Sequence, residues 1–106
     1  MRSRLELHDL FIDILGTRNE EVSRVYFQPP ASLMMNYPCI VYGRSSGDTK
    51  YANDIKYHRM KQYQVTVIDA DPDSVIPDKI ENFPLCKFST HFTKDNLNHD
   101  VYMLYY

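Results

Sequence analysis

The stretch KQYQVTVIDADPDSVIPDKI, from Lys61 to Ile80, decides the fold because its pattern changes half way along. Its first half alternates apolar with polar side chains, which is the period of a β-strand with one buried face. The buried set is Tyr63, Val65 and Val67, and the wet set is Gln62, Gln64 and Thr66. The second half repeats apolar residues at helical spacing, which predicts a short helix that ends before Pro84. The apolar residues of this helix are Ile76, Ile80 and Phe83.

Three aspartates lie between this strand and this helix: Asp69, Asp71 and Asp73. They match the first ligand positions of a calcium loop, but Ser74 replaces the turn glycine and Ile80 the bidentate glutamate. A strand ending in Asp-x-Asp also resembles the nucleophile motif of haloacid-dehalogenase-type phosphatases, but those enzymes have Thr or Val two residues later, where this chain has Asp73. We therefore interpret the aspartates as a strand-to-helix corner, with Asp73 or Ser74 capping the helix and Pro77 in its first turn.

The remaining patterns complete an α+β fold. RLELHDLFIDILG predicts an amphipathic helix that ends at Gly16, with a core stripe formed by Leu7, Leu10, Phe11, Ile14 and Leu15. Short β patterns predict an edge strand at 25–28 and a buried strand at 37–44. CKFSTHFT and VYMLYY predict a C-terminal hairpin with Phe88 and Phe92 on one face. We expect one domain over 1–106, with a small mixed or antiparallel sheet, an N-terminal amphipathic helix, a second short helix and a C-terminal β-hairpin.

The composition is that of an ordinary globular chain. Hydrophobic residues make up 43% of the 106 residues and charged residues 25%, with a formal net charge of -2, so generic attraction to nucleic acid is not expected. VYMLYY is the longest apolar run and is too short to span a bilayer. The first residues carry charges where a signal peptide needs an apolar block. We expect no membrane association and no signal peptide.

No motif for catalysis, metal binding or cofactor binding stands out. Cys39 and Cys86 are isolated, which favours two buried, reduced thiols over a disulfide framework or a zinc site. The four histidines do not pair at helical spacing, and three glycines cannot form a glycine-rich phosphate loop. We expect a protein that is not an enzyme and has no cofactor.

The segment from Arg44 to Lys61 is locally basic and aromatic. It carries five cations against two aspartates, and its composition permits a solvated loop, a site for single-stranded nucleic acid or an arm that binds a protein partner. Long loops in small domains are usually functional, and Tyr and Arg are enriched at protein interfaces, so we favour the arm. The predicted interface residues are Arg44, Tyr51, Tyr57 and Arg59.

Four phrases carry the order of these elements: VYFQPP, YPCIVYGR, YQVTVIDADPDSVIPDKI and DNLNHDVYMLYY. Together they resemble the small tail-completion proteins of long-tailed phages and prophages of Gram-positive bacteria, the tail-terminator or tail-to-head joining family. The resemblance extends from about Leu5 to Tyr106. It implies a small α+β fold that assembles as a homo-oligomeric ring, expected to be a hexamer, without catalysis.

The resemblance also implies partners and a location. Such a ring caps the head-proximal end of the tail tube, ends tube polymerisation and joins the tail to the head. Its partners would be the tail tube protein and a head-closure or neck protein, and DNA would pass through the lumen without specific binding. A slight negative charge suits that passage. The protein would belong to the tail or neck of the virion, after assembly in the host cytoplasm.

Three other functions remain open. A different neck component, such as a head-closure or adaptor protein, would differ in ring stoichiometry. A metal-dependent phosphohydrolase using Asp69, Asp71 and Asp73 would bind a divalent ion and lose it in Asp71→Asn. A nucleic-acid-binding module would retain oligonucleotides in a salt-sensitive manner through Lys56, Arg59 and Lys61.

Overall fold

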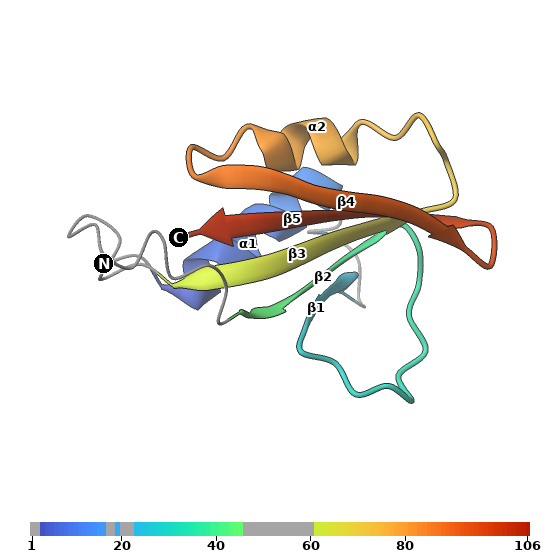
Figure 1. Ribbon diagram of the computed structural model, residues 1–106. Coiled ribbons are helices and arrows are strands. Elements are labelled where there is room, and N and C mark those ends of the chain that lie inside the picture. The colour runs from blue at the N-terminus through green and yellow to red at the C-terminus, as the bar shows by residue number, and fades with distance from the viewer. Residues whose placement is uncertain (1–2, 17–18, 20–22, 46–60) are drawn as a thin grey trace.

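The computed structural model describes residues 3–16, 19, 23–45 and 61–106. Its elements are α1 (Arg4–Leu15), β1 (Val25–Phe27), β2 (Cys39–Arg44), β3 (Gln62–Asp69), α2 (Ile76–Glu81), β4 (Cys86–Lys94) and β5 (Leu97–Tyr105). The strands form one mixed sheet in the order β1-β2-β3-β5-β4, in which only β1 and β2 are parallel (Figure 1). The predicted α+β fold, with its N-terminal helix, short second helix and C-terminal hairpin, is confirmed.

Helix α1 begins and ends as its sequence predicts. The Ser3 hydroxyl accepts a hydrogen bond from the Glu6 amide, and Gly16 ends the helix with a left-handed φ of 72°. Leu7 and Phe11 are fully buried. The prediction that Leu10 belongs to the core is wrong, because this side chain is 39% exposed and faces the groove between the two helices.

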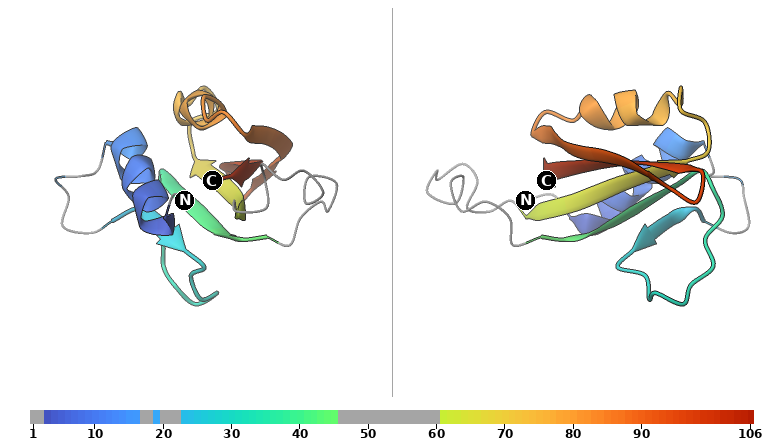
Figure 2. Two further views of the ribbon diagram at one scale, coloured as in Figure 1. Left: turned by 90° about the vertical axis from the view of Figure 1, so that its left-hand side faces the viewer. Right: turned by 45° about the vertical axis from the view of Figure 1, so that its right-hand side comes forward.

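Both helices cover the same face of the sheet, as the two views of Figure 2 show. The core lies between them and the sheet. Its buried members are Leu7, Phe11, Val25, Ile40, Tyr42, Tyr63, Val65, Val67, Ile76, Ile80, Tyr102, Leu104 and Tyr106. Five aromatic rings of this layer form a chain of contacts, each ring against the next, in the order Phe27, Tyr42, Phe11, Phe83 and Tyr106. Large aromatic surfaces therefore fill the space that two short helices leave.

The central strand β3 follows the predicted alternation with one exception. Tyr63, Val65 and Val67 are buried in the core, and Gln64 on the opposite face is exposed. Gln62, however, is only 8% exposed. It pairs with Tyr105 of β5, and its carbonyl oxygen accepts a hydrogen bond from the Ser45 amide, so neighbours enclose it on both sides. The prediction that Gln62 is wet is therefore wrong.

The corner before α2 has the predicted structural role. The side chains of Asp69 and Asp71 accept hydrogen bonds from the amides of Asp71 and Asp73, and the Ser74 hydroxyl accepts one from the Ile76 amide. Val75 occupies the N-cap position and makes no side-chain capping bond, so the prediction that Asp73 or Ser74 is the capping residue is wrong. Proline lies in the first turn as expected. These bonds turn the chain between the end of β3 and the beginning of α2.

The C-terminal hairpin has a two-residue turn and contains a β-bulge. Asp95 and Asn96, with φ values of 54° and 64°, form a two-residue turn. The register shifts between Phe88 and Thr90 of β4, so Ser89 is an extra residue. Phe88 therefore packs against Tyr102 on the helix side, whereas Phe92 lies on the opposite side. The prediction that Phe88 and Phe92 share a face is wrong for this reason.

Candidate functional site

The face of the sheet that no described helix covers is partly apolar. Its central rows contain Val41 and Met103, which are half-buried, and Ile68 and Val101, which are buried. Towards the β4 edge, the ring of Phe92 stacks on that of His99 with 4.5 Å between their centroids. Phe92 nevertheless remains 45% exposed. This face therefore presents apolar and aromatic surface to water.

A glutamine side chain closes one end of this face. Gln28 follows β1, and its Oε1 accepts a hydrogen bond from the Arg44 amide at 3.0 Å. The side chain crosses Gly43, where an added Cβ would lie 3.0 Å from the Gln28 Cγ. A glycine at 43 thus allows Gln28 to satisfy an edge amide that the short strand β1 does not reach.

The segment between β1 and β2 exposes further apolar side chains. The Tyr26 hydroxyl accepts a hydrogen bond from the Asn36 amide, and Arg24 donates to the Tyr37 carbonyl oxygen, so the segment is held at two points. Within the loop that the Tyr26–Asn36 bond closes, Met34 is 90% exposed and Leu33 is 41% exposed. Exposed methionine and leucine on a long connection are typical of contact surfaces.

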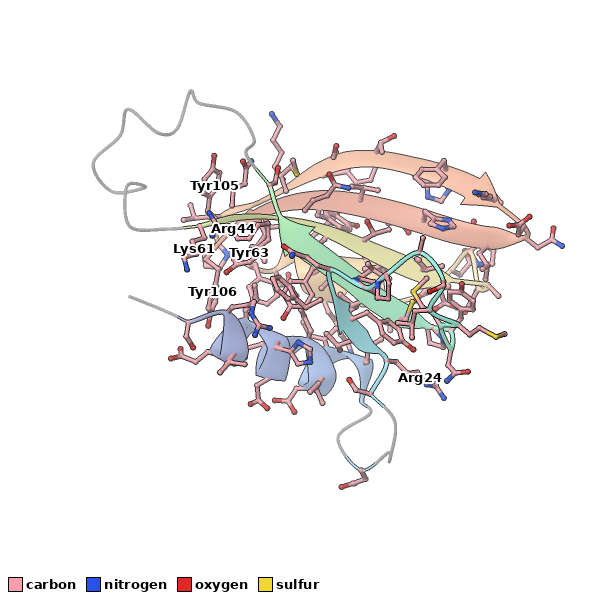
Figure 3. All side chains as sticks on the ribbon, turned by 90° about the horizontal axis from the view of Figure 1, so that it is seen from below. Arg24, Arg44, Lys61, Tyr63, Tyr105 and Tyr106 are labelled. Carbon is pink, nitrogen blue, oxygen red and sulfur yellow. The ribbon has the colours of Figure 1, made fainter. Side chains whose placement is uncertain are left out.

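One end of the sheet is basic and rich in tyrosine. β2 ends here, β3 begins and β5 ends, and Figure 3 shows the labelled Arg44, Lys61, Tyr105 and Tyr106 together at this end. Strand residues 43–45, 61–63, 86–88 and 103–106 include the exposed cations Arg44, Lys61 and Lys87 and no carboxylate side chain. Gln62 lies among them, and its buried Oε1 accepts no hydrogen bond from any described residue.

The opposite end of the sheet is acidic. Asp71 and Asp73 are exposed at the corner after β3, and Asp95 is exposed at the turn between β4 and β5. Together with Asp69, these residues give this end four carboxylates. The cations at the same end are Arg24 and Lys94. Within residues 3–16, 19, 23–45 and 61–106, no three acidic, histidine or cysteine side chains are grouped to hold a metal ion.

A polar network connects α1 to β2 at the edge of the core. The Tyr42 hydroxyl accepts a hydrogen bond from Arg4 at 3.2 Å and contacts His8 Nδ1 at 2.7 Å. Arg4 also stacks over the Phe27 ring. The Tyr42 hydroxyl has two lone pairs besides its hydrogen, so the direction of its hydrogen bond with His8 Nδ1 depends on the His8 tautomer. Burial and the nearby Arg4 lower the pKa of His8 from its usual 6.5. The network thus satisfies a buried hydroxyl at the contact between α1 and β2.

A shallow groove separates α1 from α2. Its volume is about 420 Å³, and it is lined mainly by apolar groups. The lining residues are Leu10, Asp13, Ile14, Lys79, Asn82, Phe83 and Pro84. The groove contains no histidine or cysteine, and its character suits an apolar contact better than a reaction.

The two cysteines are poor nucleophiles. Cys39 is fully buried, and burial raises the pKa of its thiol to about 12. Cys86 is only half-buried, which departs from the prediction, but desolvation still raises the pKa of its thiol to about 11. Neither thiol is ionised near neutral pH, and the described cysteines form no disulfide.

The predicted interface residues are only partly described. Arg44 is exposed at the basic end, as expected of a contact residue. Tyr51, Tyr57 and Arg59 lie outside the described residues. Sequence reasoning did not find the exposed Leu33 and Met34, nor the open sheet face, although the apolar letters of ASLMMNYP gave a signal for the former.

Comparison of the chain with protein-family models, with curated protein sequences and with solved structures finds no match. The described helices include none long and apolar enough to cross a membrane.

Proposed function

We propose that the protein is a structural, ring-forming subunit of a phage tail, which ends the tail tube at its head-proximal end and joins it to the head. The observation that carries this proposal is the open sheet face together with the exposed apolar segment beside it. Large apolar patches on a soluble domain usually mark contacts with other proteins. Leu33, Met34 and Phe92 are among the large apolar residues that would be covered by such contacts.

The fold and the chemistry of the described residues support a structural role. The α+β fold of the described residues agrees with the fold class that the tail-terminator resemblance implies. The carboxylates of Asp69 and Asp71 accept amides of their own corner. The alternative of a metal-dependent phosphohydrolase has no support in this arrangement.

Native mass spectrometry over a concentration series, with and without Mg²⁺, tests the proposal. A hexamer is the expected result, and electron microscopy should then show rings bound to the ends of tubes formed by the tail tube protein of the same phage. A ring of another stoichiometry that does not bind tube ends would favour a head-closure or adaptor protein. A monomer that binds stoichiometric Mg²⁺ and loses it in Asp71→Asn would contradict the proposal.

A further inference from the structure

We propose that neighbouring copies of this chain contact each other head to tail, with the basic end of one copy against the acidic end of the next. The basic end is defined by Arg44 and Lys61, and the acidic end by Asp71 and Asp73. This inference rests on the proposed ring and identifies the surfaces that would form it.

The two ends lie on opposite sides of the molecule. β3 begins directly after Lys61 and ends two residues before Asp71, and its eight residues span about 23 Å at the usual rise. Figure 1 shows the corner after β3 and the β4–β5 turn at one side and the C-terminus of the chain at the other. A contact between unlike ends of identical subunits is heterologous, and such contacts close into rings when the rotation permits.

The charges of the two ends are complementary and available. Arg44 and Lys61 are exposed, and neither has an ion-pair partner among the described residues. Asp71 and Asp73 are also exposed without a described cation partner, and the Asp71 carboxylate uses one oxygen for the amide of Asp73. Opposite potentials of this kind orient partners and suppress like-with-like docking.

The basic end also offers an uncharged feature that a partner could use. Tyr105 is half-buried there, beside Gln62, whose Oε1 is enclosed without a described donor. Aromatic side chains are enriched at the centre of protein contacts, and polar groups surround them at the rim. This combination favours a second protein surface over a simple solvated end. A single-stranded nucleic acid at the same cations is the competing occupant, and the test below separates the two.

Two charge-reversal variants test the contact. One carries Arg44→Glu with Lys61→Glu, and the other carries Asp71→Lys with Asp73→Lys. Each variant alone should assemble at a concentration on the order of tenfold or more above that of the wild type, because attraction becomes repulsion at every contact. An equimolar mixture should recover assembly as alternating rings with equal numbers of the two variants, measured by native mass spectrometry.

Two controls separate charge from folding. Glu6→Lys with Asp78→Lys changes the net charge as much as the corner variant but lies on the helices, and it should assemble like the wild type. Asp71→Asn with Asp73→Asn keeps the acceptor oxygens of the corner and removes its charges, so its assembly should weaken less than that of the reversal. Circular dichroism should show all variants folded.

Three results would overturn the inference. Reversal variants that assemble like the wild type would show that the ring is formed by other surfaces. This result would not contradict the proposed ring itself. Loss of oligonucleotide binding in Arg44→Glu with Lys61→Glu, with unchanged assembly, would assign the basic end to nucleic acid. A wild type that stays monomeric alone but still caps tubes in electron micrographs would refute charge-driven contact without refuting the proposed tail function.

Discussion

The two faces of the sheet are built by different means. The helix-covered face is filled by side chains at regular strand and helix spacing, and Leu7, Phe11 and Ile80 are completely buried there. The open face is shaped by single irregular features: a bulge at Ser89, a glutamine over a glycine and a long connection. Regular spacing produces a packed core on the first face, and local exceptions produce an exposed, partly apolar surface on the second.

The largest expected effect comes from truncating an aromatic side chain on the covered face. Phe11 is fully buried and contacts the rings of Tyr42 and Phe83, so Phe11→Ala should lower the free energy of unfolding by about 3–5 kcal/mol. Phe92→Ala on the open face is the matched control and should lower the free energy of unfolding by about 1 kcal/mol or less. Urea unfolding followed by circular dichroism measures both. Equal losses would mean that the two faces do not differ as described.

A double-mutant cycle sharpens the description of the open face. Gly43→Ala should destabilise the protein by about 1 kcal/mol, because its Cβ displaces Gln28 and leaves the Arg44 amide without its acceptor. In a Gln28→Ala background the same change should be neutral or stabilising, since alanine restricts the unfolded chain more than glycine. Urea midpoints of the four proteins give the coupling. Additive effects would show that Gln28 does not lie over Gly43.

The smallest effect is a pH dependence at the seam between α1 and β2. Burial and Arg4 hold the pKa of His8 below 6.5, with Asp9 opposing them more weakly. The unfolded chain therefore binds a proton first, so the free energy of unfolding should fall as the pH drops below about 6.5 and level off once it passes the folded pKa.

His8→Gln removes the titrating group and should flatten that part of the stability profile between pH 7 and 5. His91→Gln, at the exposed pair with Asp100, serves as a control at a site outside this network. Thermal unfolding at several pH values gives the comparison. An unchanged profile in His8→Gln would contradict a lowered pKa of His8 in the folded protein.

The covered face was predictable because its residues follow the periods of their elements. Leu7, Phe11, Val65 and Ile80 lie where strand and helix spacing place them, and Gly16 gives the expected stop for α1. The predicted burial of Leu10 was wrong because this side chain lines a groove between α1 and α2. The periodicity of one helix does not show whether a second helix covers it.

The open face could not be predicted from periodicity. The extra residue at Ser89 moves every later side chain of β4 to the opposite face of the sheet from the one that alternation predicts. A serine has no property that marks a bulge in the sequence. Parallel pairing of β1 with β2 also left no sequence signal. Of the candidate site, exposure of Arg44 and the corner formed by Asp69, Asp71 and Ser74 were predictable, because turn and charge chemistry are local.

The strand order has a consequence for synthesis of the chain. β5 lies between β3 and β4, so the described strand that leaves the ribosome last is inserted within the sheet rather than added at its edge. Until Leu97–Tyr105 emerges, β4 has no partner and one side of β3 stays unpaired. A nascent chain that has not yet exposed β5 therefore cannot complete this sheet, and until then the unpaired edges of β3 and β4 are open to association with other copies.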